Sequence, residues 1–432
     1  MVLRRDRNGI RRGCILAVVL IALALASPRA SARVYTLDEC VELALSSNVT
    51  LAQARQGVES GRASRLASWS GALPRISGSV GYGDDLSVSH DTETSSDGYT
   101  GRVGLTQTIF DGSTFAGISG SGHELSAVEH SFEATRRAIV LDAKRRYYGL
   151  LKTRQLRDVQ KESLELTREQ LRKTQSLFDL GSASKSDLLK AQVQVGQAEL
   201  GLISAEKSAE SARAELCYVL GIDILTDIEP VDPVEGEGEE EILTFDLAEA
   251  LARRPDVMAK EEKVLAARRS LLSAKAARWP DLGLSVTYSR SQDSLGDLFD
   301  DPTDEYKRQV GLSLSVPIFS GLATKASIDG GKAALRSEEL SLRDTRLAAA
   351  RDIEVARLSV LEQKRSVAVA ETAVQQAEED LRISEERYRL RAASMLERID
   401  ARVAYSSARA SLVEARYNYE ITKAELANAL GL

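Results

Sequence analysis

"YTLDECVELALSSN", residues 35–48, has a counterpart later in the chain in "LTFDLAEALARRPD", residues 243–256. Asp38 of the first segment aligns with Asp246 of the second, so the offset is 246 − 38 = 208 residues. Two further pairs keep nearly the same offset: Phe110 with Phe319, 209 residues apart, and Gly221 with Gly431, 210 residues apart. A nearly constant offset across two whole halves indicates one structural unit duplicated in tandem.

The duplication sets the expected domain organisation. The first repeat is predicted to span residues 33–222 and the second residues 244–432, with an inter-repeat linker over residues 223–243. The linker contains the acidic run "EGEGEEE", which is more typical of a solvated surface segment than of an ion site. The two repeats are expected to build one composite domain.

The first 32 residues have the pattern of a secretory signal peptide. Arginines precede an apolar run from Cys14 to Ala26, which is too short for a membrane-spanning helix, and Ala30-Ser31-Ala32 offers a small-residue cleavage site. An N-terminal membrane anchor is the alternative. Removal of residues 1–32 takes away six basic and one acidic residues, so the net charge changes from −7 to −7 − 5 = −12. Nucleic acid is not an expected partner, because its binding needs a basic surface.

Long segments of the mature chain have a strong helix preference. Residues 332–430 contain neither Gly nor Pro, and their Ala, Leu, Glu and Arg residues enter helices at little cost. Apolar and small residues recur there at alternating steps of three and four, as in Val367, Ala370, Val374, Ala377 and Leu381. This spacing predicts a left-handed coiled-coil seam. The first repeat has an equivalent helix pair at about residues 114–178 and 185–220. A plain coiled-coil rod remains an alternative at this point.

Each repeat also contains two segments that alternate like β-strands, at about residues 75–83, 99–110, 281–289 and 306–319. Apolar residues alternate with small or polar ones over about ten residues, which is the pattern of transmembrane β-strands. Four tyrosines lie towards the loop ends, where an interfacial girdle is expected: Tyr82, Tyr99, Tyr288 and Tyr306. Hairpins of a soluble sheet are the alternative. Four strands would leave two unpaired edges in lipid, so the chain is expected to assemble, and three copies give twelve strands.

The whole mature chain resembles the TolC family of outer-membrane efflux and export channels. The resemblance rests on the duplication, on the order of helices and strands, and on five segments: "ALP" (72–74), "QTIFDG" (107–112), "LFDLGSASKSDLLKAQ" (177–192), "VPIFSG" (316–321) and "ALGL" (429–432). It implies a mainly α fold with a transmembrane β-barrel, built from a duplicated helix–strand–strand–helix-pair unit. As a homotrimer, this unit would form a twelve-stranded barrel and a long periplasmic α-barrel. The N-terminal segment, the linker and the C-terminus would form an equatorial region.

The resemblance also implies a function as a channel-tunnel in the outer membrane. Such a trimer is the exit duct for an inner-membrane RND, ABC or MFS transporter and a periplasmic adaptor (membrane fusion) protein, in tripartite efflux or type I secretion. Outer-membrane lipid would surround the barrel. A structural or adaptor-like periplasmic coiled-coil protein is the alternative, although no lipoyl-like β-domain is visible between the helices.

The functional residues implied by the resemblance lie at the turns of the two helix pairs, residues 180–184 and 390–394. In the family these turns form the periplasmic tip, and the implied adaptor-contacting residues are Leu180, Gly181, Ser182, Leu390, Arg391 and Ala392. The implied periplasmic gate consists of Asp187, Tyr388, Glu397 and Asp400. Ser184 or Ser186 is expected to cap the helix that follows the first turn.

The second turn departs from the family pattern in two ways. Arg391 occupies the position of Gly181 in the first repeat, which puts the usual turn geometry in question. The basic residue that many relatives place within this turn is missing, because Ala393 and Ser394 occupy the stretch. The candidates to replace it are Lys185, Arg387 and Arg398.

No enzymatic, metal or cofactor site is expected. The three histidines, His90, His123 and His130, do not have metal-ligand spacing, and no nucleophile elbow or phosphate-binding loop is visible. The mature chain keeps Cys40 and Cys217, which the resemblance places in the equatorial region. An oxidising periplasm permits a disulfide, but the Cα separation that decides it cannot be read from a sequence.

Overall fold

The computed structural model describes residues 33–89, 92–232, 245–300, 306–390 and 392–432, with the backbone alone for residues 33, 84–89 and 92–97. The expectations for the signal peptide, for residues 233–243 of the linker and for Arg391 lie outside the described residues. Among the described helices, none combines the length and the apolar character needed to cross a membrane.

The chain divides into two compact units, each of which takes segments from both sequence repeats. The first unit comprises Met1–Asn48, Val140–Glu237 and Gln363–Ile421, and the second comprises Val49–Ile139, Gly238–Glu362 and Thr422–Leu432. The long helices α4 (Gly112–Asp179) and α9 (Ala323–Arg389) contribute residues to both units.

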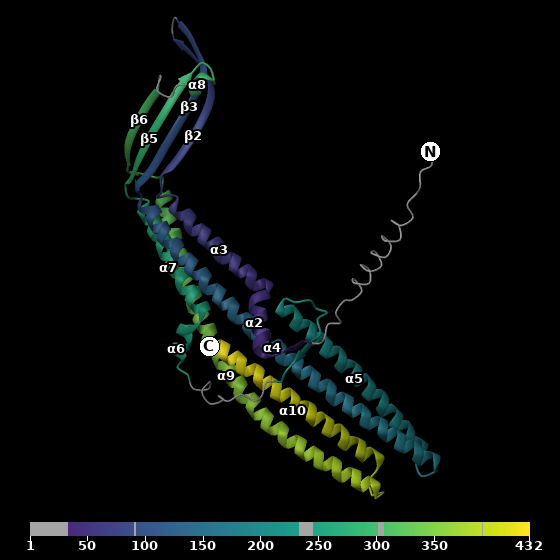
Figure 1. Ribbon diagram of the computed structural model, residues 1–432. Coiled ribbons are helices and arrows are strands. Elements are labelled where there is room, and N and C mark those ends of the chain that lie inside the picture. The colour runs from purple at the N-terminus through teal and green to yellow at the C-terminus, as the bar shows by residue number, and fades with distance from the viewer. Residues whose placement is uncertain (1–32, 90–91, 233–244, 301–305, 391) are drawn as a thin grey trace, which may run out of the picture. The chain divides into compact units, whose positions relative to one another are not determined.

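The second unit contains a four-stranded antiparallel sheet in the order β2-β3-β5-β6 (Figure 1). Its strands are β2 (Arg75–Ser89), β3 (Thr92–Phe110), β5 (Asp281–Gln292) and β6 (Tyr306–Ser315). Since β3 pairs with β5, the strands of the two repeats belong to one continuous sheet.

The observed strands differ from the expected ranges at their ends. β2 and β3 extend further towards the loop that connects them, because their pairing continues to Ser89 opposite Thr92. β6 ends at Ser315 rather than near residue 319. Pro317 has no backbone N–H for a strand ladder, and Gly321 and Leu322 have positive φ angles of 61° and 71°. The chain therefore turns before α9 begins.

The sheet has one apolar face and one polar face. Directly paired residues lie on the same face of a sheet, and the register aligns Ile76, Leu105, Val286 and Val310 across the four strands. The next row aligns Ser77, Gly104, Thr287 and Gln309 on the opposite face. Ile76 and Val310 are each 72% exposed. A long row of exposed branched apolar side chains fits lipid rather than water.

The remaining elements of the second unit are helical. They are α3 (Val49–Trp69), α6 (Leu247–Arg253), α7 (Pro255–Ala276) and the short α8 (Asp297–Asp300). The carboxylate of Asp111 begins α4, because it accepts hydrogen bonds from the backbone N–H of Ser113 at 2.9 Å and of Thr114 at 3.3 Å. A Cβ at Gly112 would lie 2.6 Å from the Trp279 ring, so only glycine lets α4 start this close to the end of α7.

The first unit contains α2 (Leu37–Ser47), α5 (Lys185–Leu220) and most of α10 (Met395–Ala429), packed with parts of α4 and α9. A two-stranded parallel ribbon pairs β1 (Arg33–Tyr35) with β4 (Ile228–Pro230). The Tyr147 hydroxyl lies 3.0 Å from the carbonyl oxygen of Tyr35 and 2.5 Å from that of Val231. This hydroxyl joins the N-terminal strand and the start of the linker to α4.

The packing of α2 against α5 brings both cysteines into the core of the first unit. Cys40 and Cys217 are fully buried, and both are free thiols. Gly221 ends α5 with a φ of 69°, and a Cβ there would lie only 2.4 Å from the carbonyl oxygen of Ser47. The Asn48 side-chain amide donates a hydrogen bond to the Val219 carbonyl at 2.8 Å, which completes this junction.

Candidate functional site: the two helix-hairpin ends

The turn between α4 and α5 is closed by two backbone hydrogen bonds. The N–H of Ser182 donates to the Leu177 carbonyl at 2.7 Å, and the N–H of Gly181 donates to the Phe178 carbonyl at 2.9 Å. Gly181 has a φ of 69°. These are the bonds and the left-handed glycine of a Schellman helix end. The motif ends α4 abruptly and leaves Leu180 78% exposed at the hairpin end.

The turn between α9 and α10 contains the equivalent backbone hydrogen bond at the end of α9. The N–H of Ala392 donates to the Arg387 carbonyl at 2.8 Å, which is the counterpart of the bond from Ser182 to Leu177. Leu390 is 68% exposed, like Leu180 in the first hairpin. The helix end therefore keeps this closing bond although the sequence has no glycine in this turn.

Both following helices begin with a capping box. Ser184 is the N-cap of α5: its hydroxyl accepts from the Asp187 N–H at 3.1 Å, and the Asp187 carboxylate accepts from the Ser184 N–H at 3.4 Å. Ser394 and Glu397 repeat this arrangement at α10, with distances of 3.2 and 3.3 Å. The two boxes are 394 − 184 = 210 residues apart. Of the two serines expected to cap α5, Ser184 does so.

The three acidic residues expected at the gate have different surroundings. The Asp187 and Glu397 carboxylates serve the helix caps, and Glu397 also lies 3.8 Å from the Arg387 guanidinium. Asp400 is exposed and, among the described residues, forms no hydrogen bond or ion pair. No hydrogen bond or ion pair within the described chain joins Asp187 to Glu397 or Asp400. Of the three carboxylates, Asp400 is therefore the one without a partner in the described chain.

Tyr388 contacts a cation on the other helix of its hairpin. The Arg398 guanidinium carbon lies 5.0 Å from the centroid of the Tyr388 ring, within cation–π range. The first repeat has Phe178 at the equivalent position, since 388 − 178 = 210, with the Lys185 ammonium 5.5 Å from its centroid. Each hairpin is thus held by one aromatic ring and one cation, and Arg398 is the candidate basic residue that contacts Tyr388.

Two poorly exposed arginines share a carboxylate next to this ring. Arg402 Nη2 lies 2.8 Å from Glu385 Oε1, and Arg398 Nη2 lies 3.7 Å from the same oxygen. The Arg398 and Arg402 side chains are only 12% and 18% exposed. Burial, and then the charge of Arg402, lower the pKa of Arg398. Arg402 also donates to the Leu166 carbonyl of α4 at 3.1 Å, so this cluster joins three helices.

A neutral polar contact extends the cluster on α4. Gln170 Nε2 donates to the Thr174 hydroxyl at 3.0 Å and approaches the Met395 sulfur at 3.5 Å. Gln170 Oε1 is buried without a hydrogen-bond partner in the described part of the chain, as are the Nε atoms of Arg398 and Arg402. A buried polar group without a partner costs free energy. The cluster is therefore a polar joint with unsatisfied groups, close to the end of the second hairpin.

Sequence reasoning missed this joint, although the two repeats contain a signal for it. At an offset of 210, Glu385, Arg398 and Arg402 correspond to Gln175, Leu188 and Gln192. Three charged residues thus occur in the second repeat where the first has none. The sequence indicates Arg398 only as a candidate replacement for the missing basic residue of the turn, while Arg402 and Glu385 lie further along their helices.

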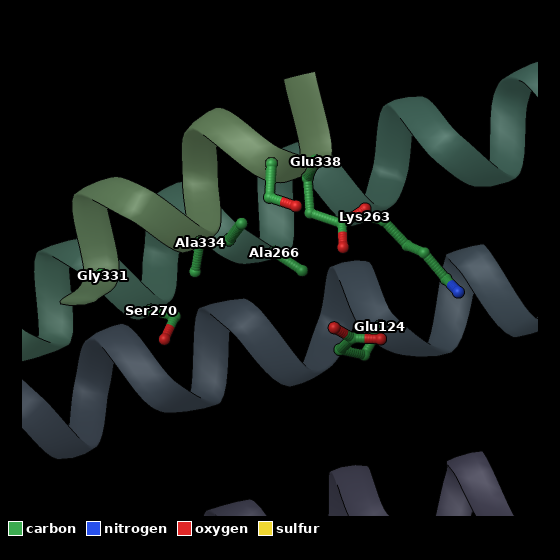
Figure 2. A pocket seen from close by; sticks show the side chains of 9 residues that line it. Glu124, Lys263, Ala266, Ser270, Gly331, Ala334 and Glu338 are labelled. Atoms are coloured by element: carbon green, nitrogen blue, oxygen red, sulfur yellow. The ribbon is translucent and has the colours of Figure 1, made fainter. Parts of the chain in front are cut away.

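The second unit contains a separate cavity of about 350 Å³ between α4, α7 and α9 (Figure 2). Small residues form most of its wall, and its charged residues are Glu124, Lys263 and Glu338. None of the residues expected at the gate or the tips lines it. Within the described chain, no group of three or more His, Cys, Asp or Glu side chains is placed to hold a metal ion.

The hairpin ends and the two-faced sheet define a class of protein, the outer-membrane channels with a helical periplasmic part. The chain matches the family described as "Outer membrane efflux protein" over residues 40–222 and 247–432. It therefore belongs to the outer membrane efflux protein family. The gap between the two matched segments coincides with the inter-repeat linker. Membership confirms the TolC-type resemblance and assigns the chain to the outer membrane, as a channel protein of efflux systems.

Relatives with known names are distant in sequence. The chain is 23% identical over 406 residues to the outer membrane efflux protein BepC of Brucella suis biovar 1 (strain 1330), covering 92% of this chain and 85% of that protein. It is 27% identical over 251 residues to protein CyaE of Bordetella pertussis, covering 57% of this chain and 52% of that protein.

Solved structures of outer-membrane channels share the fold of this chain despite low sequence identity. The Campylobacter jejuni CmeC outer membrane channel superposes with a TM-score of 0.85 at 20% identity, covering 91% of this chain and 85% of that chain. The Vibrio cholerae outer membrane protein VceC gives a TM-score of 0.82 at 19% identity, covering 91% and 96%. At this identity the likeness establishes the fold: a duplicated unit of helices and strands with a large helical portion.

Proposed function

We propose that three copies of this chain form one continuous duct, which is the outer-membrane exit of an inner-membrane pump. The pump would be an RND, ABC or MFS transporter joined to the duct by a periplasmic adaptor protein. The sheets of three protomers would close into a twelve-stranded barrel surrounded by outer-membrane lipid. The helix-hairpin ends would form the periplasmic entrance.

The main support for the trimer is the open sheet with one strongly apolar face. Its order β2-β3-β5-β6 leaves β2 and β6 as edge strands in the described chain. Unpaired backbone groups are not tolerated in lipid, so each edge needs a partner. Pairing β6 of one protomer with β2 of the next is the simplest ring that satisfies every edge, and cyclic symmetry closes it.

The hairpin ends supply two features that suit an entrance. Leu180 and Leu390 are exposed apolar tips, and the space where a Gly181 side chain would lie is open, with no atom within 4 Å. A partner hairpin can approach such a surface closely. Above the tips, Asp187, Glu397 and Asp400 would contribute carboxylates from each of three protomers. A ring of carboxylates attracts cations and repels anions.

Cross-linking between strand edges tests the trimer. A protein carrying both Ser79→Cys in β2 and Gln309→Cys in β6 should give covalent trimers with a short bis-maleimide in native outer membranes. Either single variant should stay monomeric, because β2 is expected to meet β6 and never another β2. The native Cys40 and Cys217 are buried and should not react. Cross-linked dimers from a single variant would contradict this arrangement.

Charge substitutions test the adaptor contact at the tips. Gly181→Asp and Ala392→Asp should abolish export while leaving the yield of membrane-inserted trimers unchanged. Gly57→Asp is the control for added charge, since it places the same charge at an exposed helical glycine with open space around it, outside the hairpins. Normal export by both tip variants would show that the adaptor binds elsewhere.

A further inference from the structure

The polar face of the sheet contains a row with two cations. The register aligns Ser79, Arg102, Ser289 and Lys307 across β2, β3, β5 and β6, so Arg102 and Lys307 flank Ser289 on the same face. Both cations are exposed. In the described part of the chain neither forms an ion pair with an acidic residue.

Side-chain contacts support the assignment of the two faces. On the polar face, the Thr100 and Ser291 hydroxyl oxygens lie 3.3 Å apart across β3 and β5. The hydroxyl oxygen of Ser285 lies 3.0 Å from the position of a Cβ at Gly311. On the apolar face, the Arg308 guanidinium lies 5.0 Å from the centroid of the Tyr306 ring. Lys307 and Arg308 are thus neighbours in sequence with side chains on opposite faces.

The described strand residues of the polar face have an excess of positive charge. Among the strand residues whose side chains the structure describes, the cations on this face are Arg75, Arg102 and Lys307, and the acidic residue is Asp281. Asp281 pairs with Ser315, at the opposite end of β5 from the pair of Ser289 and Lys307. Among the strand residues with described side chains, no acidic residue of this face lies beside Arg102 and Lys307.

We propose that this row makes the barrel end of the duct an anion-attracting passage, with Arg102 and Lys307 as residues that determine charge specificity. This inference rests on the proposed trimer, in which the polar face lines the lumen. Three protomers would then place six cations at one level of the barrel. Rings of Arg and Lys favour anions in pores, and charges on the lumen side tune selectivity.

The solutes favoured at this level are those with carboxylate, phosphate or sulfonate groups. The Arg102 guanidinium can hold such groups through two parallel hydrogen bonds, and the Lys307 ammonium adds a compact charge beside it. The carboxylates of the hairpin ends have the opposite sign. The duct would therefore have an acidic entrance, which favours cations, and a basic passage at its barrel end, which favours anions.

The local potential can be measured with one cysteine and two reagents. Ser289→Cys places a thiol between the two cations, and the rates of its modification by an anionic and a cationic methanethiosulfonate are compared at low salt. We expect the ratio of anionic to cationic rates to fall about ten-fold when Arg102→Gln and Lys307→Gln are added, since fields of several kT alter local ion concentrations on this scale. Arg308→Gln, which removes a neighbouring charge on the opposite face, should leave the ratio unchanged.

The possible outcomes separate this inference from the function on which it rests. An unchanged ratio after the double substitution, with the introduced thiol reacting readily, would overturn the basic passage but leave the water-filled duct intact. A thiol at position 289 that reacts with neither charged reagent would show that this face is not lined by water. That result would overturn the placement of the polar face in the lumen, and the inference with it.

Discussion

The Arg398 guanidinium lies over the ring of Tyr388, 5.0 Å from its centroid, and joins α10 to α9 within one protomer. The tyrosine expected at the gate is therefore held by a cation of its own hairpin. The same cation approaches Glu385, which also binds Arg402 at 2.8 Å. Movement of one hairpin helix away from the other would have to break all of these contacts.

Substitutions of Tyr388 separate its ring from its hydroxyl group. Tyr388→Phe keeps the cation–π contact with Arg398, whereas Tyr388→Leu removes it, a loss of about 0.5–1 kcal/mol at a partly exposed site. We expect Tyr388→Leu to raise the mean single-channel conductance, with Tyr388→Phe close to the wild type. Planar-bilayer recordings of both variants decide the question. A Phe variant that opens as readily as the Leu variant would assign the restraint to the hydroxyl group, and hence to a contact other than Arg398.

Removal of the shared carboxylate should weaken the joint of three helices. Glu385→Gln removes the ion-pair partner that the poorly exposed Arg398 and Arg402 share. We expect this to cost about 1–3 kcal/mol, between the values for exposed and buried pairs. Thermal melting of the detergent-solubilised trimer measures this loss. The equivalent residue of the first repeat supplies the control: Gln175→Ala loses one exposed hydrogen bond to Asp179 and should cost below about 1 kcal/mol. Equal losses in the two variants would mean that the shared carboxylate of Glu385 stabilises the protein no more than one exposed hydrogen bond does.

Much of the helical architecture could be predicted, because its determinants are local. Ser184 lies three residues before Asp187, and a glycine lies at the preceding helix end, so capping and termination can be read directly from the chain. The helix α5 spans Lys185–Leu220, the same range as the expected second helix of the first pair. Alternation of side chains likewise located the four strands of the antiparallel sheet, since the faces of a strand have a period of two, whereas the short β1 and β4 were not predicted.

The remaining features depend on residues far apart in sequence. Arg402 reaches the Leu166 carbonyl, 236 residues away, and no local pattern predicts such a bond. Glu397 and Asp400 share one helical face, but only Glu397 completes a cap, in agreement with its position three residues after Ser394. The sequence could not show that Asp400 has no partner in the described chain.

The two carboxylates of α10 should affect ion selectivity unequally. Asp400→Asn removes a charge with no partner in the described chain, whereas Glu397→Gln removes one that already interacts with Arg387 and a helix cap. Gln can still complete a capping box, so Glu397→Gln should not destabilise α10. We expect the larger shift of reversal potential, towards weaker cation preference, from Asp400→Asn. Bilayer recordings in a salt gradient test this order, and the reverse order would mean that Glu397 leaves its cap in the assembled channel.

The buried thiol of Cys40 should make the first unit sensitive to alkali. Burial, followed by the nearby Glu39 and Cys217, raises the pKa of Cys40 from 9.0 to about 12. The folded chain thus keeps a proton that the unfolded chain loses near pH 9, so stability present below pH 9 is lost as the pH rises towards 12. The loss is at most about 4 kcal/mol. Thermal melting at pH 8 and pH 10.5 should show a smaller alkaline drop for Cys40→Ala than for the wild type. An identical drop, or rapid alkylation of Cys40 in the folded protein at pH 8, would refute the assignment.

Two glycines with the same backbone conformation offer a matched test of the junction between α2 and α5. Gly181 and Gly221 both have a φ of 69°, but a Cβ at Gly181 would meet no atom within 4 Å, whereas one at Gly221 would lie 2.4 Å from the carbonyl oxygen of Ser47. Alanine should cost about 1–2 kcal/mol at either position for the left-handed backbone, and about 1–3 kcal/mol more at Gly221, because α2 must move. Melting temperatures of the two variants measure the difference directly. Equal melting temperatures would show that the backbone strain alone sets the cost, and that α2 does not rest on the end of α5 in the assembled protein.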